Sequence, residues 1–191
     1  CRNTEILFTI GEEGGMNGVK NMDLSMIKGK EAMVFDASGD VGKILTCGPG
    51  QIKIFATIIG RSSHAGLAPE EGISAIQVAA KGIAKMNLLR IDEETTCNIG
   101  TLKAEYATNI VPEKAEFVAG VRSRNLDKLN AQAAHMQKCL QDACDEMGAK
   151  LEIELKTNYV SFNVANDDPM VQRVFESCKR IGCEPMTAKG G

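Results

Sequence analysis

Two adjacent carboxylates, Glu12 and Glu13, are the first residues in the chain that could perform acid–base chemistry. They follow an apolar run at residues 5–10 (EILFTI) and lie in the glycine-rich segment 11–15 (GEEGG). Neighbouring side chains point in different directions, so one carboxylate can ligate a metal ion while the other takes a proton from a metal-bound water. A solvated turn would have the same composition, so the chemistry depends on which groups lie nearby.

A third carboxylate, Asp36, follows a second apolar run at residues 31–35 (EAMVF). On its own it is ambiguous, because Asp commonly opens turns. Residues 16–27 between the two runs can form a short helix, which makes a strand, helix, strand unit. The strands of such a unit are normally parallel and end at the same sheet edge, where open α/β sheets place their ligand sites. The sequence therefore predicts that Glu12, Glu13 and Asp36 lie close together.

His64 lies in the run GRSSHAG at residues 60–66, with Pro69 and Gly72 downstream. A histidine in a loop is more often a surface side chain than a catalyst, but this glycine and proline spacing is the most specific pattern in the chain. Two further candidates are Asn109 in TNIVP and Arg122 in GVRS. An Asn turn and a surface Arg at a strand end are the simpler interpretations of these two residues.

The elements that must position these residues form two groups. From residue 51 onward the pattern predicts strands at 51–60, 98–105, 114–123 and 151–158, with helices at 70–89 and 126–147. The order βαββαβ is the split βαβ, ferredoxin-like arrangement, and about 110 residues suffice for a domain of its own. Asp168 and Pro169 then begin a helix that ends near Gly182. We expect that helix to return to the first domain.

The fold class expected from the sequence is an α/β fragment of a catalytic domain with an inserted α+β ferredoxin-like lid or dimerisation domain. The catalytic domain is expected to comprise residues 1–49 and 164–191, both incomplete, and the lid residues 50–163. His135 lies beside the apolar face of the long helix without a partner at ligand spacing, so we interpret it as structural. The chain begins without Met and ends on Gly190 and Gly191, so we expect an internal piece of a longer protein.

Composition narrows the class of protein further. The formal net charge is −3 and the pI about 5.5, so there is no basic field to attract a phosphate backbone, and only two Tyr and six Phe are available for stacking on bases. We therefore expect no nucleic-acid partner.

The spacings of the seven cysteines do not include the two-residue gap of a zinc ribbon or redox motif, which indicates reduced thiols. No apolar run reaches the length of a membrane span and no signal peptide is visible, which predicts a cytoplasmic protein without a membrane partner.

The runs FTIGEEGG at residues 8–15, VFDASG at 34–39 and GRSSHAG at 60–66 resemble motifs of the dizinc exopeptidases of the peptidase T and glutamate carboxypeptidase family. The resemblance spans essentially the whole chain. It implies that Glu12 is the general base and that Glu13 and Asp36 each bind one of two divalent metal ions, zinc in this family. It also implies that His64 stabilises the oxyanion of the tetrahedral intermediate, often across a dimer interface.

Further implications concern substrate and assembly. Asn109 and Arg122 match lid positions that contact substrate in relatives, and Arg122 could hold a carboxylate with two hydrogen bonds. The resemblance implies a metallopeptidase that acts on short peptides as an aminopeptidase and forms a homodimer through its lid. An N-acyl amino acid amidohydrolase of the same family is the first alternative. A noncatalytic dimerisation module, whose acids are surface turns, is the second.

The sequence departs from the family pattern in its metal ligands. The family's centre also uses an upstream His, a bridging Asp and a downstream His, and none of these is present. Zinc takes about four ligands, and only Glu13 and Asp36 match ligand positions. We therefore expect this chain alone to bind zinc weakly and to lack peptidase activity.

Overall fold

The computed structural model describes residues 4–13 and 15–190, and the chain divides into two compact units. One, here called the sheet unit, comprises Thr46–Asn163 and Lys189–Gly191. The other, here called the discontinuous unit, comprises Cys1–Leu45 and Val164–Ala188. No helix in the described part of the chain is long and apolar enough to cross a membrane.

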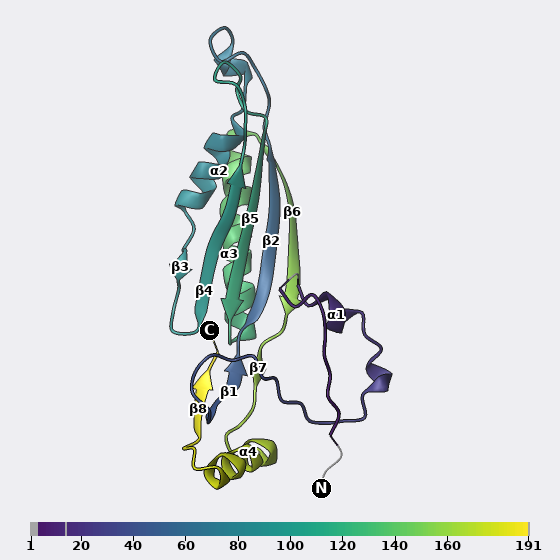
Figure 1. Cartoon of the computed structure of the whole chain (residues 1–191). Coiled ribbons are helices and arrows are strands. Elements are labelled where there is room, and N and C mark those ends of the chain that lie inside the picture. The colour runs from purple at the N-terminus through teal and green to yellow at the C-terminus, as the bar shows by residue number, and fades with distance from the viewer. Residues whose placement is uncertain (1–3, 14, 191) are drawn as a thin grey trace. The chain divides into compact units, whose positions relative to one another are not determined.

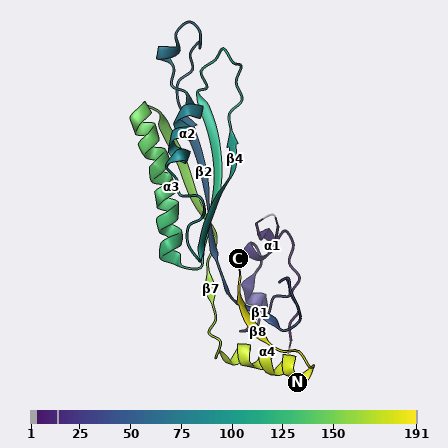
Figure 2. The same cartoon turned by 90° about the vertical axis from the view of Figure 1, so that its left-hand side faces the viewer.

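The sheet unit is a five-stranded antiparallel sheet with the strand order β3-β4-β5-β2-β6. The helices α2 and α3 cover one face of this sheet and leave the other face open (Figures 1 and 2). The elements in chain order are β2 (Gly50–Ile59), α2 (Ala75–Ala84), β3 (Leu89–Arg90), β4 (Thr95–Lys103), β5 (Lys114–Ser123), α3 (Leu126–Met147) and β6 (Lys150–Tyr159), with a 3-10 turn η2 (Pro69–Glu71) before α2.

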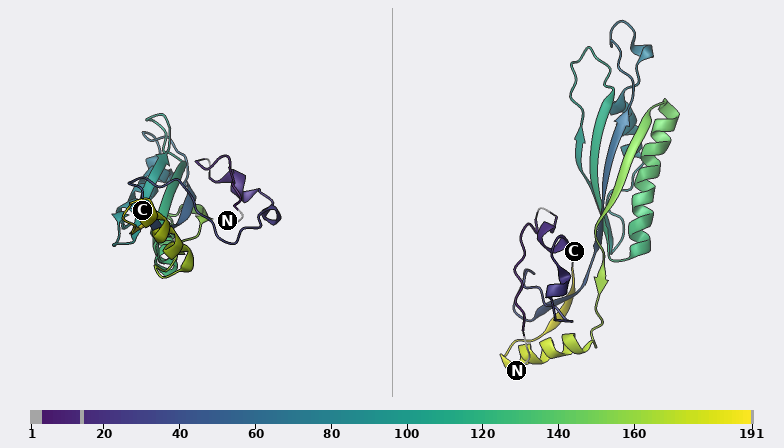
Figure 3. Two further views of the ribbon diagram at one scale, coloured as in Figure 1. Left: turned by 60° about the horizontal axis from the view of Figure 1, so that its bottom comes forward. Right: turned by 90° about the vertical axis from the view of Figure 1, so that its right-hand side faces the viewer.

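The core lies between the sheet and its two helices. Alternate residues of β5 point toward the helices, as the period of two predicts: Ala115, Phe117, Ala119 and Val121 are all buried. The apolar stripe of α3 packs against them, and the long helix runs along the sheet (Figure 3). The alternation that the sequence predicted for residues 114–123 is therefore confirmed.

The ends of α3 follow from local hydrogen bonding. The Asn125 side chain accepts a hydrogen bond from the Lys128 N–H at 3.1 Å, which satisfies one of the free donors of the first turn. Gly148 ends the helix with φ of 72°, a left-handed conformation that glycine adopts without steric cost. The helix predicted at residues 126–147 is confirmed.

The remaining elements lie outside the five-stranded sheet and the two helices that cover it. They are α1 (Asn17–Lys20), η1 (Leu24–Met26), β1 (Lys43–Gly48), β7 (Phe162–Asn163), α4 (Pro169–Arg180) and β8 (Met186–Lys189), and the three strands form a sheet of order β7-β1-β8. Asp168 caps α4, because its carboxylate accepts a hydrogen bond from the Met170 N–H at 2.8 Å, and Pro169 occupies the first turn, as predicted. The three short strands β1, β7 and β8 were not predicted, and neither was β3 of the sheet unit.

The strands predicted at residues 5–10 and 31–35 are wrong for this chain. Both segments are irregular and pair with no other described strand, and Phe8 and Phe35 are 91% and 94% exposed. An apolar strand is stable only when neighbouring strands satisfy its backbone and other elements cover its side chains. Neither is present here, so the α/β sheet expected of a catalytic domain does not form among the described residues. The predicted helix at 16–27 is reduced to α1 and η1.

Candidate functional site

The loop between β2 and α2 brings His64 next to Asn109, which lies in the connection between β4 and β5. His64 forms an isolated antiparallel bridge with Ile110, and the Ala65 N–H donates to the Asn109 carbonyl at 2.9 Å. The Val111 N–H donates to the Ser63 carbonyl, also at 2.9 Å. Two of the predicted site residues, 45 positions apart in the chain (109 minus 64), are therefore adjacent in the fold.

The base of this loop is fixed by a second group of backbone hydrogen bonds. The Gly60 N–H donates to the Glu113 carbonyl at 2.7 Å, and the Ala75 N–H donates to the Pro112 carbonyl at 2.8 Å. Arg61 and Ile73 exchange a further pair of bonds at 3.0 and 2.8 Å. The loop that carries His64 is therefore hydrogen-bonded along much of its length rather than free.

Two glycines of the motif are required by space. A Cβ atom on Gly60 would lie 2.0 Å from the Ile73 carbonyl oxygen, and one on Gly72 would lie 2.4 Å from the Ser63 hydroxyl. Neither glycine has a positive φ, so close approach of the backbone, rather than its conformation, excludes a side chain. The spacing of the glycines is visible in the sequence. The reason for it, close contact with Ile73 and Ser63, is visible only in the structure.

The His64 ring is exposed and has a defined hydrogen bond. Its Nδ1 accepts a hydrogen bond from the Gly66 N–H at 3.2 Å. A neutral imidazole carries one proton, so acceptance at Nδ1 places that proton on Nε2. The neutral side chain can therefore donate a hydrogen bond from Nε2 to an oxygen of a bound molecule, which is the chemistry that oxyanion stabilisation requires.

Arg122 lies far from His64 within one chain. The His64 loop meets β5 at Lys114, next to the bond from Gly60 to Glu113, whereas Arg122 is eight residues further along the same strand. At the usual strand rise of ~3.3 Å per residue the two ends are about 26 Å apart. Arg122 is exposed and pairs in register with Gln51 and Thr96, so its guanidinium is available to a ligand.

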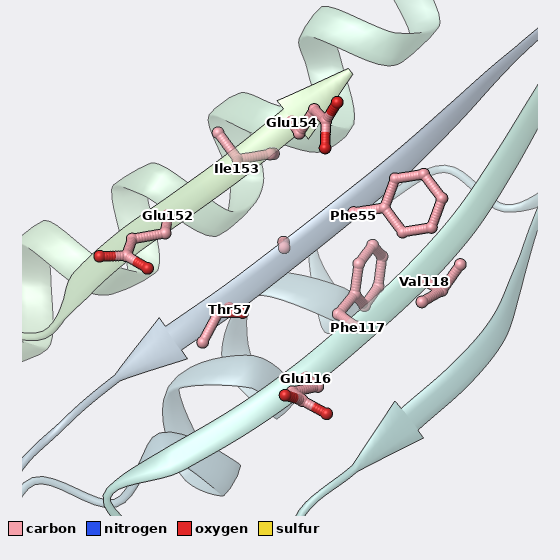
Figure 4. Close-up of a pocket in the computed structure, with 9 residues that line it drawn as sticks. Phe55, Thr57, Glu116, Phe117, Val118, Glu152, Ile153 and Glu154 are labelled. Carbon is pink, nitrogen blue, oxygen red and sulfur yellow. The ribbon is translucent and has the colours of Figure 1, made fainter. Parts of the chain in front are cut away.

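The open face of the sheet carries a shallow hollow of about 470 Å³, which the sequence did not indicate (Figure 4). Two of its carboxylates are paired with lysines: Lys114 bonds to Glu116 at 2.7 Å and Lys150 bonds to Glu152 at 2.6 Å. These lysines lower the pKa of the two carboxyls. The side chains from the central and edge strands that line it include Phe55, Thr57, Glu116, Val118, Glu152 and Glu154.

The predicted acids lie in the discontinuous unit. Glu12 and Glu13 are in an exposed turn before α1, where the Glu12 carbonyl accepts hydrogen bonds from the N–H groups of Gly15 and Met16 at 2.9 Å. Asp36 is exposed in the irregular segment that follows residues 31–35. No group of three or more His, Cys, Asp or Glu side chains among residues 4–13 and 15–190 could hold a metal ion.

Sequence comparison agrees with this arrangement of strands and loops. Residues 49–148 match the model of the peptidase dimerisation domain of the M20 peptidases, and the chain belongs to that family. Because the match covers β2 through α3, it includes His64, Asn109 and Arg122.

Individual relatives extend the similarity over almost the whole chain. The uncharacterised protein YqjE of Bacillus subtilis is 40% identical over 189 residues, which are 98% of this chain and 51% of YqjE. The crystal structure of the aminopeptidase PepT from Bacillus cereus superposes with a TM-score of 0.88 at 40% identity, covering 96% of this chain and 49% of that one. A tripeptidase from Staphylococcus aureus superposes with the same score at 34% identity, covering 96% of this chain and 49% of its own. The chain therefore spans about half the length of these relatives.

Proposed function

We propose that the whole protein is a metal-dependent exopeptidase that hydrolyses short peptides in the manner of a tripeptide aminopeptidase. The similarity to an aminopeptidase and a tripeptidase over 96% of the chain supports this substrate class. In this proposal the sheet unit is a lid and dimerisation domain of the ferredoxin-like class. Its connection order β2-α2-β4-β5-α3-β6 and its strand order support that class.

The observation that carries the proposal is the pairing of the His64 and Asn109 loops. Backbone bonds at 2.9 Å hold the two residues side by side, and the Nδ1 bond from Gly66 leaves a proton on Nε2 of a neutral His64. We infer that His64 donates this proton in a hydrogen bond to the oxyanion that forms at the scissile carbonyl, while Asn109 contacts the substrate. Donors fixed before the reaction stabilise developing charge without reorganisation.

Arg122 is proposed to bind the substrate in the same reaction, although it lies at the other end of β5 from the His64 loop. An exposed guanidinium suits the carboxylate at the end of a short peptide. Because about 26 Å of strand separates it from the His64 loop, we infer that one substrate cannot meet both residues of a single chain. A homodimer in which each site takes His64 from one subunit and Arg122 from the other resolves this separation.

The metal ligands in this chain do not complete a centre. Glu13 and Asp36 are two exposed carboxylates, and the described residues contain no cluster of three ligand side chains around them. This donor set does not fit two zinc ions, each of which takes about four ligands. We propose that Glu13 and Asp36 contribute one ligand each in the whole protein, that Glu12 accepts a proton there, and that the chain alone binds zinc weakly without peptide turnover.

Replacement of His64 tests the proposal in the whole protein. We expect His64→Ala to lower kcat for a tripeptide by ~10²–10³, the range seen when one oxyanion donor is removed. His135→Ala is the matched control, because His135 is the other histidine of the chain and lies on α3, where its Nε2 accepts the Asn87 N–H at 3.2 Å. Thermal unfolding of both variants verifies that each is folded.

The outcome separates the candidates. Loss of tripeptide turnover in His64→Ala alone supports the exopeptidase. Turnover of an N-acyl amino acid but not of tripeptides supports the amidohydrolase, for which Arg122 is equally suitable. Absence of any hydrolysis by the whole metal-loaded protein, with a dimer still present, would identify a noncatalytic dimerisation module. Stoichiometric zinc and peptide turnover by the 191-residue chain itself would contradict the inactivity proposed for it.

A further inference from the structure

Two cysteines occupy the paired positions of the turn that ends α4. The Cys183 N–H donates to the Cys178 carbonyl at 2.9 Å, and the Gly182 N–H donates to the Lys179 carbonyl at 3.1 Å. Gly182 has φ of 77°. These two bonds and the left-handed glycine define a Schellman motif, in which the side chains at the positions of Cys178 and Cys183 commonly contact each other.

The hydrogen bond sets an upper limit on the separation of the two residues. Standard backbone dimensions place the carbonyl oxygen ~2.4 Å from its own Cα and the amide nitrogen ~1.5 Å from its own. With an N···O distance of 2.9 Å, the Cα atoms of Cys178 and Cys183 are at most about 6.8 Å apart. Disulfides form at Cα separations of about 4.4–6.8 Å, so the turn keeps the two residues below the upper Cα limit for a disulfide.

The environment distinguishes this pair from the other described cysteines. Both thiols are free, with Cys183 half-buried and Cys178 buried. The turn between them contains Lys179 and Arg180. Glu176 lies 3.9 Å from the Arg180 guanidinium and offsets part of its charge, so Lys179 is the main positive group that attracts an anionic reagent. By contrast, Cys97, Cys139 and Cys144 are buried in the core of the sheet unit, and Cys47 lies in a strand of that unit.

We propose that Cys178 and Cys183 form a redox-active dithiol that a small, anionic disulfide oxidises to an intramolecular bond. The Cys183 thiolate attacks one sulfur of the reagent, whose S–S bond breaks and releases one thiol. The Cys178 thiolate then attacks the Cys183 sulfur and releases the second thiol. Two thiol protons and two electrons pass from the protein to the reagent, and one protein S–S bond replaces the S–S bond of the reagent.

Glutathione disulfide is a suitable probe for this reaction in the 191-residue chain. After incubation, free thiols are alkylated and the chain is digested with trypsin without a reductant. Trypsin cleaves after Lys179 and Arg180, between the two cysteines, so the proposed bond joins two separate peptides whose combined mass is lower by two hydrogens. We expect this linked pair as the main oxidised product.

Single-cysteine variants test the second step. Cys178→Ser should retain the glutathione adduct on Cys183 at a level about tenfold above the wild type, because only the wild type has a second thiol at the paired position of the turn to displace it. The double variant Cys183→Ser with Glu184→Cys keeps the number of thiols but moves one of them by a residue, out of the hydrogen-bonded position. We expect it to give the adduct rather than the linked peptides.

Two results would overturn the proposal. One is an equal level of glutathione adduct in the wild type and in Cys178→Ser. The other is a bond from Cys183 to a cysteine other than Cys178. Circular dichroism of each variant before oxidation checks that its total helix content, to which α4 contributes, is unchanged.

Discussion

At the residue scale, the motif around His64 depends on glycines that are needed for different reasons. Gly60 and Gly72 are packed too closely for a side chain, whereas a Cβ on Gly66 would meet His64 at 3.6 Å, an ordinary contact. The sequence pattern showed all three glycines as equals. Only the opposing residues, Ile73 and Ser63, reveal which of them are constrained.

This difference predicts the stability of two matched variants. Gly60→Ala forces the Cβ against the Ile73 carbonyl and should lower the free energy of unfolding by ~1–3 kcal/mol, the range for overpacked sites. Gly66→Ala should change it by less than ~0.5 kcal/mol. Urea unfolding followed by circular dichroism measures both. A Gly60→Ala variant as stable as Gly66→Ala would show that the loop can move away at little cost.

At the element scale, the sequence predicted the strand at residues 114–123 and the helix at 126–147 with their observed bounds. The helix predicted at 70–89 is shorter, because α2 comprises only Ala75–Ala84. In the discontinuous unit, the strands predicted at 5–10 and 31–35 are wrong. The strand at residues 114–123 and the helix at 126–147 match because their partners, β2, β4 and β6, belong to the same chain. The runs at 5–10 and 31–35 have equally apolar sequences, but no described strand lies beside them. A hydrophobic pattern indicates that a segment can form a buried strand. Whether the strand forms depends on neighbouring strands that pair with it and on elements that cover its side chains.

The prediction of the candidate site also depended on which strands pair with each other. His64 and Asn109 are adjacent because β2 and β5 pair over ten residues and bring their flanking loops together. The expected convergence of Glu12, Glu13 and Asp36 relied on a parallel sheet that these segments do not form here, so their roles stay a proposal. The open-face hollow carries no sequence motif at all.

One turn between elements is expected to respond to pH. Asp92, between β3 and β4, accepts hydrogen bonds from the N–H groups of Glu94 at 2.9 Å and Thr95 at 2.8 Å, and Lys128 of α3 lies 3.1 Å from its other oxygen. The Glu94 hydrogen bond is the main cause that lowers the pKa of Asp92 from 3.8 to about 2.

A lowered pKa in the folded state means that the charged form is the one stabilised. The contribution of Asp92 should be complete above its unfolded pKa of 3.8 and be lost as the pH falls from there through about 2. We expect Asp92→Asn to remove this part of the acid dependence and to leave the dependence above pH ~5 unchanged. Urea midpoints measured across this range compare the two proteins, and parallel curves would contradict the prediction.

At the scale of the whole molecule, the two units differ in how much apolar surface they bury. The sheet unit has a continuous core that includes Phe117, Met136 and Leu140. In the described part of the discontinuous unit, the only buried apolar side chains are Val171 and Cys178. Stability is therefore expected to be uneven along the chain.

Limited proteolysis should reveal this unevenness. Chymotrypsin should cleave at Phe8 and Phe35, which are exposed in irregular segments, well before it cleaves at Phe117 in the core. The expected stable product begins near β1 and retains all of β2 to β6. Mass spectrometry of a time course identifies the order of cleavage, and early cleavage at Phe117 would show that the sheet unit does not fold as a separate body.

The bonds that hold the His64 and Asn109 loops together leave the exposed side chains of these loops free to vary. The four contacts across them, Ala65 to Asn109, Val111 to Ser63, Gly60 to Glu113 and Ala75 to Pro112, all join backbone atoms. Exposed side chains in these loops, such as Ser62, Leu67 and Thr108, take no part in them. Mutations can therefore change those side chains, and with them the surface that contacts a ligand, without breaking the backbone hydrogen bonds that place His64 next to Asn109.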